Sequence, residues 1–246
     1  ENFSFIRMFY TNVGPSPRLA ISPDGNIIAV GKGSTSDRCG KIEIWDIKKN
    51  QCIHKLNKHT NLVSVLVITP DNKLVSGSWD KTIRVWDIES GKCLKVLEGQ
   101  KSFVYALAVT PDGNTLVSSS SNPNIIKIWD LSTGKCVNTI ETSAEKALAI
   151  TPDGKNIVTG YGIWSLKTGE CIKKLKSYDT HLKFIAKVND ENATITIKDE
   201  YIKYGELKLF DEDGNYLKTL KKQKDFINTL SISSVIQEIA IEHDDF

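Results

Sequence analysis

KLVSGSWDKTIRVWDIESGKCLKVL, residues 73–97, is the stretch that decides the fold of this chain. Polar turns separate three short apolar segments within it, at residues 73–77, 82–86 and 92–97. β-Branched residues at alternate positions, bounded by Gly, Asp and Ser, are typical of strands joined by hairpins. A fourth apolar run lies just upstream at residues 62–68. The four segments predict one antiparallel sheet, which needs neighbouring sheets to bury its apolar faces.

The same unit recurs along the chain. The positions equivalent to Trp86 fall at intervals of 41, 43, 35 and 46 residues and are occupied by Trp45, Trp129, Trp164 and Phe210. A period of about 40–45 residues is that of a four-stranded propeller blade. Pro-Asp-Gly or Pro-Asp-Asn turns recur in step, at residues 23–25, 70–72, 111–113 and 152–154. Proline sets φ at the first turn position, and Gly or Asn tolerates the left-handed one.

Three apolar segments end in a Trp-Asp pair, at residues 45–46, 86–87 and 129–130. With these motifs in register over nearly its whole length, the chain resembles the WD-repeat family of β-propellers. The resemblance implies an all-β fold, a β-propeller of four-stranded antiparallel blades. It also implies that family's common role, which is to hold other proteins together, without naming a partner.

The register predicts a single WD-repeat propeller domain over residues 1–246, with five full blades and a partial sixth. The full blades are expected at residues 18–56, 62–97, 103–140, 145–175 and 180–220. The sixth would combine residues 226–246 with an outer strand at residues 2–10. One strand is missing from it, so either the last blade has three strands or the chain is a fragment of a longer ring, such as a seven-bladed one. An unclosed ring would expose sheet edges and permit self-association.

Three blades depart from the pattern. Blade one is expected to carry an enlarged loop at residues 31–40, between its second and third strands. In blade four only residues 161–162 separate the middle strands, which must therefore be short. Blade five lacks the Pro-Asp-Gly turn and has Phe210 in place of the tryptophan.

Blade two contains the full set of residues that, by resemblance to the family, form a structural hydrogen-bond relay: Asp80, His59, Ser76 and Trp86. A buried indole N–H needs an acceptor, and each further polar group must be satisfied in turn. By residue type Asp80, His59 and Ser76 also match a hydrolase triad, but the repeat register explains all three as scaffold. Blade three has Gln100 at the histidine position and Asn122 or Asn124 near the aspartate position, so we expect it to be less rigid.

The family resemblance also predicts a rim for partner binding, because loops between blades and the starts of innermost strands line one face around the central channel. The residues at these positions are Leu62, Ser64, Trp79, Phe103, Tyr105, Ala144, Lys146, Phe226 and Asn228. Trp, Tyr and Phe are the residue types that anchor protein interfaces. Two interpretations stay open, since Trp79 and Phe103 either bind a partner or only cover a neighbouring blade.

Charge and hydropathy exclude some classes of partner. Lys and Arg (32) nearly balance Asp and Glu (30), which argues against nucleic acid and against an anionic membrane. No apolar run approaches the ~18 residues that span a bilayer. Lysine runs at residues 173–176 and 218–224 fall on or after outermost strands, where lysine protects an open sheet edge.

Cysteines and histidines indicate no catalytic, metal or cofactor site. One cysteine lies seven residues after the tryptophan of each of four repeats, at Cys52, Cys93, Cys136 and Cys171. Equivalent positions in different blades are too far apart for disulfides, so these side chains are predicted to be small buried hydrophobes. Reduced cysteines favour a cytoplasmic protein. The histidines at positions 54, 181 and 243 show no metal-ligand spacing.

The leading hypothesis is a noncatalytic interaction scaffold or sensor module that presents a rigid rim to a protein or peptide, as part of a larger regulatory protein. A propeller enzyme at the channel mouth is one alternative, and it would need acids, histidines or metal ligands converging from several blades. A module that binds a small ligand or nucleic acid there is another.

Overall fold

The computed structural model describes most of the first two thirds of the chain and, beyond that, the backbone of individual strands. The described residues are 18–34, 39–120, 124–142, 148–151, 153–159, 162–174, 183–188, 191–198, 205–211, 216–223, 227–232 and 239–243. The predicted outer strand at residues 2–10 and residue Asn122 lie outside them.

The strands form consecutive antiparallel sheets, and the described residues include no helix. Sheet 1 contains β1 (Arg18–Ile21), β2 (Ile27–Ser34), β3 (Cys39–Asp46) and β4 (Gln51–His59). Sheet 2 contains β5 (Val63–Ile68), β6 (Lys73–Ser78), β7 (Ile83–Asp87) and β8 (Cys93–Leu97). Sheet 3 contains β9 (Val104–Val109), β10 (Thr115–Ser120), β11 (Ile125–Asp130) and β12 (Lys135–Glu141).

Sheet 4 contains β13 (Leu148–Ile150), β14 (Asn156–Thr159), β15 (Gly162–Ser165) and β16 (Cys171–Lys174). Sheet 5 contains β17 (Lys183–Val188), β18 (Glu191–Lys198), β19 (Gly205–Asp211) and β20 (Tyr216–Gln223). A two-stranded sheet of β21 (Ile227–Ile232) and β22 (Ile239–His243) follows. The predicted all-β fold of four-stranded antiparallel sheets is confirmed, and the middle strands of sheet 4 are short, as expected.

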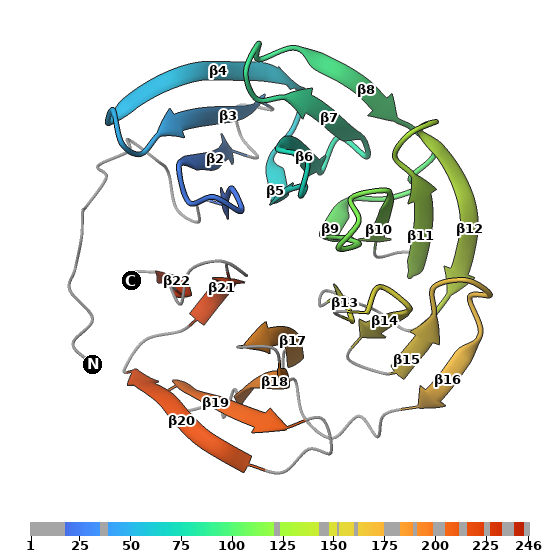
Figure 1. The fold of residues 1–246 in the computed structure, drawn as a ribbon. Coiled ribbons are helices and arrows are strands. Elements are labelled where there is room, and N and C mark those ends of the chain that lie inside the picture. Colours follow the sequence, from blue (N-terminus) through green and yellow to red (C-terminus); the bar gives the residue numbers. More distant parts are fainter. Residues whose placement is uncertain are drawn as a thin grey trace.

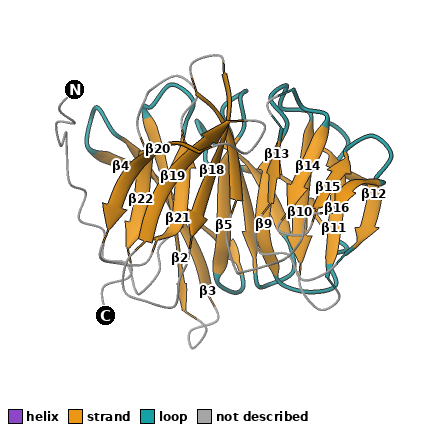
Figure 2. Ribbon diagram, turned by 90° about the horizontal axis from the view of Figure 1, so that it is seen from below, coloured by secondary structure: helices purple, strands orange, loops and turns teal. Residues whose placement is uncertain are grey.

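The sheets follow one another around a central axis, with the first strand of each sheet nearest the axis and the fourth strand of each complete sheet on the circumference (Figure 1). Seen from the side, the strands run between two ends of the molecule, where the turns and loops gather (Figure 2). Side chains from loops of neighbouring sheets can therefore meet at one end.

Tryptophans occupy one repeated place in this arrangement. Trp45, Trp86, Trp129 and Trp164 each lie on the third strand, opposite Ile28, Leu74, Leu116 and Ile157 of the second strand. In each sheet a β-bulge beside the tryptophan pairs it with the cysteine seven residues later. The repeat register read from the sequence is therefore the register of strand pairing.

Apolar side chains form three clusters, and each cluster lies between two neighbouring sheets. Trp86 belongs to the cluster between sheets 1 and 2, and Trp129 to the cluster between sheets 2 and 3. Both indoles are 1% exposed, whereas Trp45 and Trp164 are partly buried. Because each sheet buries its faces against its neighbours, hydrophobic burial holds the series together rather than any sheet alone.

The Pro-Asp turns share one side-chain hydrogen bond. The hydroxyl before the proline donates to the aspartate two residues later, as the pairs Ser22–Asp24, Thr69–Asp71, Thr110–Asp112 and Thr151–Asp153 show. The following Gly or Asn has positive φ, between 61° and 75°, at Gly25, Asn72, Gly113 and Gly154. The turn conformation predicted from these residue types is confirmed.

A second repeated contact, which the sequence did not indicate, links neighbouring sheets at their circumference. The residue nine positions after each of three tryptophans donates a hydrogen bond to a backbone carbonyl in the next sheet's outer turn. The contacts are His54 Nε2 to Glu89 O (2.7 Å), Lys95 Nζ to Leu131 O (2.7 Å) and Asn138 Nδ2 to Thr168 O (3.3 Å). Three different residue types make this contact. The repeat therefore cannot be found in the sequence by looking for one residue type that recurs at this position.

The predicted loop at residues 31–40 is wrong in most of its length. β2 extends to Ser34 and β3 begins at Cys39, so both strands enter that range and pair across it. Its glycines serve close packing instead, because a Cβ on Gly40 would lie 2.1 Å from the Asn61 carbonyl oxygen. Glycine reads as a loop signal in the sequence, but here it marks the close approach of two backbones.

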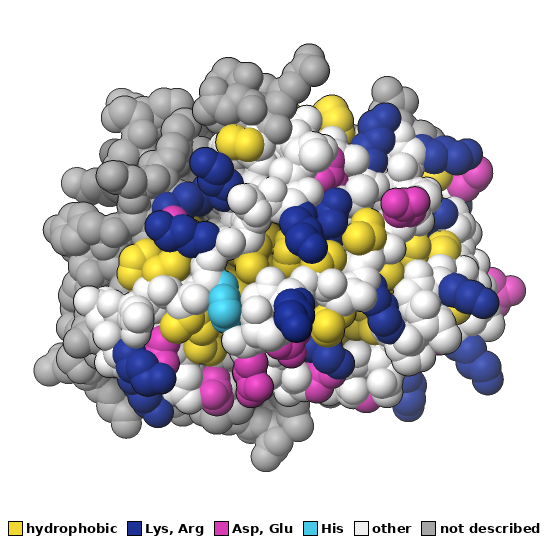
Figure 3. Space-filling model, turned by 90° about the horizontal axis from the view of Figure 1, so that it is seen from above, with side chains coloured by type: hydrophobic (Ala, Val, Ile, Leu, Met, Phe, Trp, Pro, Cys, Tyr) yellow, Lys and Arg dark blue, Asp and Glu magenta, His cyan; other side chains and the backbone are white. Residues whose placement is uncertain are grey.

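The prediction of buried cysteines is also wrong. Cys136 and Cys171 are exposed, and Cys52 and Cys93 are only partly buried. The reason is that they lie on outermost strands, which also expose Leu94, Val96, Val137 and Ile172. On the side of the molecule that carries β4 and β8, apolar side chains lie among Lys and Arg side chains (Figure 3). The lysines of the run 173–176 that are described lie on the outermost strand β16, and their role in protecting that edge stays a prediction.

Candidate functional site

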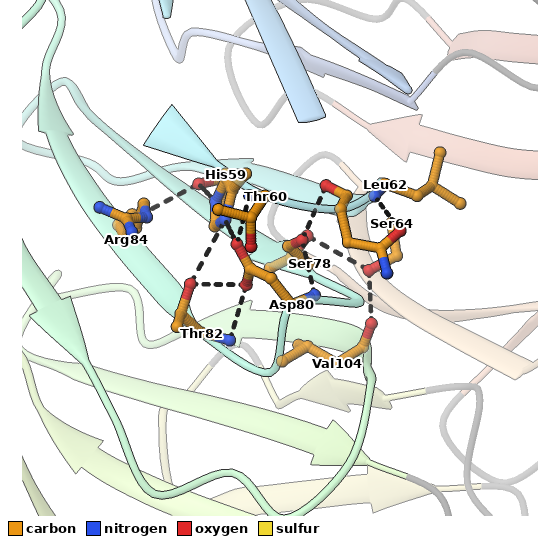
Figure 4. A network of polar contacts seen from close by, with 12 residues as sticks. His59, Thr60, Leu62, Ser64, Ser78, Asp80, Thr82, Arg84 and Val104 are labelled. Carbon is orange, nitrogen blue, oxygen red and sulfur yellow. Dashed lines mark hydrogen bonds and ion pairs between the residues drawn. The ribbon is translucent and has the colours of Figure 1, made fainter. Parts of the chain in front are cut away.

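Four buried side chains of sheet 2 and the segment before it form one hydrogen-bonded chain, and Figure 4 shows two of its members, His59 and Asp80, with the contacts around them. Trp86 Nε1 donates to Ser76 Oγ (2.8 Å), and Ser76 Oγ lies 2.7 Å from His59 Nε2. His59 Nδ1 lies 2.7 Å from Asp80 Oδ2. A carboxylate can only accept, so Nδ1 carries the hydrogen, and Nε2 and the Ser76 hydroxyl form the next bond of the chain. Every member of the relay is thereby satisfied.

Asp80 is the electrostatic centre of this network. Burial alone would raise its pKa, but hydrogen bonds from His59 and Thr82 outweigh burial and hold the pKa of Asp80 well below its usual range. Its Oδ1 accepts from Thr82 N (2.9 Å) and Thr82 Oγ1 (2.6 Å), and its Oδ2 accepts from Thr60 N (3.0 Å). The anion is therefore kept in place by donors from two loops.

This lowered pKa predicts a pH dependence of stability. The contribution of ionised Asp80 is fully present above its unfolded-state pKa, about 4, and is lost as pH falls through the lower folded-state value. We expect Asp80→Asn to be less stable than the unchanged protein near neutral pH, with the difference shrinking as pH falls below about 4. Urea unfolding of both proteins across that pH range measures the difference in their free energies of unfolding. A difference that stays constant with pH would contradict the role given to the charge.

The hydrolase interpretation of Asp80, His59 and Ser76 does not fit the geometry. Ser76 is fully buried, and its oxygen already accepts the Trp86 N–H while it bonds His59. No substrate carbonyl can reach that oxygen without opening the sheet, so these three residues hold sheet 2 together rather than form a hydrolytic site.

Sheet 3 builds the same position with other residues. Trp129 Nε1 donates to Ser118 Oγ (2.8 Å), and Gln100 Nε2 donates to the same oxygen (2.6 Å). Gln100 thus takes the place of His59, as its sequence position predicts, but its Oε1 is buried without a partner among the described residues. The shorter relay is consistent with a less rigid sheet 3, which stays a prediction.

In sheets 1 and 4 the tryptophan indole N–H donates to different acceptors. Trp164 Nε1 donates to Thr159 Oγ1 (3.2 Å), so a threonine supplies the oxygen in sheet 4. In sheet 1 the equivalent position on β2 is Val30, which has no acceptor. Trp45 Nε1 donates instead to Glu43 Oε2 (3.2 Å) on its own strand. Among sheets 1 to 4, whose side chains are described, only sheet 2 has the four-member relay.

The relay also fixes the loops at one end of sheet 2. Trp79 N donates to Leu62 O (2.9 Å), which ties the β6–β7 turn to the loop before β5. Ser78 Oγ donates to Asn61 O (3.0 Å) and accepts from Asp80 N (3.0 Å). Both loops are therefore held by the carboxylate of the relay residue Asp80 and by the neighbouring Ser78 hydroxyl, which leaves the backbone around Trp79 little freedom.

Three of the predicted rim residues meet at this end. The rings of Trp79 and Phe103 stack with centroids 4.9 Å apart and planes 7° apart. Tyr105 lies against Trp79 at 6.3 Å with a 57° tilt. Trp79 belongs to sheet 2, whereas Phe103 and Tyr105 come from the loop before β9 and from β9, and all three are partly exposed. They cover one another and still present aromatic surface to solvent.

Other predicted rim residues fare differently. Leu62 is partly buried beside Trp79, but Ser64 is buried, and its hydroxyl donates to Gly77 O (3.2 Å) and to Val104 O. Ser64 as a partner-binding residue is therefore wrong, since this position on β5 faces the neighbouring sheet. Ala144, Lys146 and Phe226 lie outside the described residues, and of Asn228 only the backbone, in β21, is described.

Several members of the network were missed from the sequence. Asn61, Ser78 and Thr82 hold the rim loops, and the spacing Ser-x-Asp-x-Thr at residues 78–82 is the signal that could have found them. Among the described residues no group of three His, Cys, Asp or Glu side chains could hold a metal ion. In the same part of the chain no helix is long and apolar enough to cross a membrane.

Comparison with known proteins agrees with the repeat. Two segments, residues 50–87 and 91–130, match the family model described as WD domain, G-beta repeat. A comparison of the whole chain with curated proteins gave no match. Each matching segment ends on a Trp-Asp pair, at residues 86–87 and 129–130, and such repeats generally mediate protein–protein interaction. The two matches support the assignment of this chain to the WD-repeat family.

Proposed function

We propose that this chain is a noncatalytic scaffold or sensor module that binds a protein or peptide on the aromatic rim, defined as Leu62, Trp79, Phe103 and Tyr105. The observation that carries the proposal is the meeting of three partly exposed aromatic rings from two sheets at one end of the molecule. Aromatic residues on a well-packed support are the usual anchors of protein interfaces.

Binding at this rim would work by rigid presentation. The Trp79 backbone N–H bonds Leu62 O, and Asp80 bonds both loops through Thr60 and Thr82. Because these loops are already ordered, a partner meets anchors whose conformational entropy has largely been lost in folding. Affinity would then depend on the contacts of the anchors rather than on loop closure.

The sheets are proposed to form a single propeller domain that closes into a ring of six. Contact between β1 and β21 supports closure, because these are the innermost strands of the first and last sheets (Figure 1). The five free cysteines favour a reducing compartment such as the cytoplasm.

The test compares two triple variants as baits for proteins in a cell extract, with quantitative mass spectrometry. The rim variant is Trp79→Ala, Phe103→Ala and Tyr105→Ala. The control variant is Leu94→Ala, Val96→Ala and Val137→Ala, which removes exposed apolar side chains from outermost strands. A partner should be retained by the control and lost by at least about tenfold with the rim variant, since hot-spot residues contribute about 2 kcal/mol or more.

Thermal unfolding of both variants controls for folding, because the rim variant loses the aromatic stacking, about 0.5–1.5 kcal/mol, together with the burial of three partly exposed rings. If the folded rim variant captures the same proteins in the same amounts as the unchanged chain, the proposal is wrong.

A further inference from the structure

The loops that carry the aromatic rim are basic. Residues 57–62, 78–82 and 98–103 contain three exposed lysines, Lys58, Lys81 and Lys101. Glu98 is their one exposed acid, because Asp80 is turned inward against His59. Arg18 adds a further cation beside these loops, with its Nε bonded to Ser64 O on β5 (2.9 Å).

The opposite ends of the same sheets are acidic. The described turns at that end contain nine acidic residues and five lysines. These turns are residues 22–26, 46–50, 69–72, 87–92, 110–114, 130–134, 153–155 and 166–170. Hydrogen bonds lower the pKa of the aspartates in these turns; those from Ser132 and Thr133, for example, lower the pKa of Asp130 to about 2. The described part of the molecule therefore has a negative end and, around the aromatic rim, a positive one.

The basic residues flank the aromatic ones in the chain. Lys81 lies two residues after Trp79, in a turn closed by the bond from Lys81 N to Ser78 O (3.2 Å) and with φ of 69° at Lys81. Lys101 lies two residues before Phe103. A left-handed lysine costs energy, and the turn that imposes it also holds Asp80 in the relay. The two lysines are thus attached to the same ordered loops as the stacked rings.

We infer that the aromatic rim binds an acidic protein segment that carries an apolar or aromatic anchor between its carboxylates, an inference that rests on the proposed function. The anchor would pack on the exposed surface of Trp79, Phe103 and Tyr105. The carboxylates would pair with Lys81 and Lys101, which raises the association rate and selects against basic partners. The acidic turns at the other end would repel the same segment and so direct it to the rim.

Single-stranded nucleic acid also combines negative charge with flat rings, but the observations favour a protein segment. Trp79 and Phe103 are already stacked on each other at 4.9 Å, so no base can enter between them. Three lysines on these loops and a net charge of +2 for the whole chain give a weak field for a phosphate backbone.

The test uses three labelled probes and two charge-reversal variants. The probes are a synthetic peptide with one Phe and one Leu among Asp and Glu residues, the same peptide with Asn and Gln in place of the acids, and oligouridine. The rim variant is Lys81→Glu with Lys101→Glu. The control is Lys92→Glu with Lys155→Glu, two exposed lysines of the opposite turns.

The acidic peptide should bind the unchanged protein and the control alike, and it should bind the rim charge variant about tenfold or more weakly. Its affinity should fall with added salt, and the amide peptide should bind weakly to all three proteins. Equal binding of the acidic peptide to both charge variants would overturn the inference. Rim-dependent binding of oligouridine without binding of the peptide would overturn it in favour of nucleic acid.

The same charge variants, used as baits in the extract, separate this inference from the proposed function. Partners lost with the aromatic variant should also be lost with the rim charge variant. Partners lost with the aromatic variant but kept by the charge variant would leave the rim in place as a binding surface and refute the acidic partner. Partners kept by both would refute both.

Discussion

Ser76→Ala is expected to lower the free energy of unfolding by about 2–4 kcal/mol, one of the two largest effects on stability. The substitution leaves two buried polar groups without a hydrogen-bond partner. Trp86 Nε1 and His59 Nε2 both bond the Ser76 hydroxyl, at 2.8 and 2.7 Å, and sheet 2 offers neither of them another acceptor or donor among the contacts described above. Urea unfolding at neutral pH measures the loss.

Ser119→Ala is the matched control for that variant. Ser119 is also a fully buried serine on a second strand, but its hydroxyl has no hydrogen-bond partner among the described residues. Removing an unsatisfied buried hydroxyl should be neutral or stabilising. Equal losses from Ser76→Ala and Ser119→Ala would show that packing volume, rather than the relay, determines the effect.

Gly40→Ala should cost about 3 kcal/mol, because the new methyl group has no room and its neighbour is backbone. The added Cβ would lie 2.1 Å from Asn61 O and 2.8 Å from His59 Cβ. Asn61 O accepts from Ser78 Oγ, and His59 is a relay residue, so the displaced loop would also disturb both. Urea unfolding gives the cost, and the indole near-ultraviolet circular dichroism reports on the surroundings of the buried tryptophans.

Gly154→Ala is the control for Gly40→Ala, because it adds a methyl group at a glycine with positive φ but without a steric clash. Gly154 has φ of 71°, and the nearest atom to an added Cβ is Pro111 Cδ at 3.5 Å, an ordinary contact. We expect a loss of only about 1 kcal/mol from the left-handed conformation. A loss at Gly40 no greater than at Gly154 would mean that the loop before β5 moves freely, contrary to the rigid rim.

The fold could be predicted from the sequence because three independent signals repeat in step. Tryptophan spacing, Pro-Asp turns and alternating apolar residues all specify the same strand pairing, and the pairing of Trp86 with Leu74 and of Trp129 with Leu116 follows it. Local sequence is enough here since each sheet is built from consecutive strands joined by short turns.

The candidate site was predictable only in part, because burial depends on the neighbouring sheet. The pattern placed Trp79 and Phe103 at one end, but it also placed Ser64 there, whose hydroxyl in fact bonds across to Val104 of sheet 3. The outer-turn contacts of His54 and Lys95 were missed for the same reason, as their acceptors lie in the next sheet. Single-sheet reasoning cannot see contacts between sheets.

The relay and the rim are parts of one mechanism. Asp80 holds Thr60 and Thr82, and the loops containing them carry Leu62 and Trp79. A relay buried for stability thereby fixes the orientation of residues proposed for recognition. Sheet 3 contributes Phe103 and Tyr105 from beside Gln100, where the shorter relay leaves an amide oxygen unpaired. The rim is expected to be stiffer on its Trp79 side.

Hydrogen exchange of the amides, measured with and without a captured partner, tests the central claim most directly. The account predicts that the partner slows exchange at residues 59–62, 78–82 and 100–105, where the aromatic rim and its supporting loops lie, and leaves the outermost strands β8 and β12 unchanged. Protection confined to those outermost strands, with the rim exchanging as before, would contradict it.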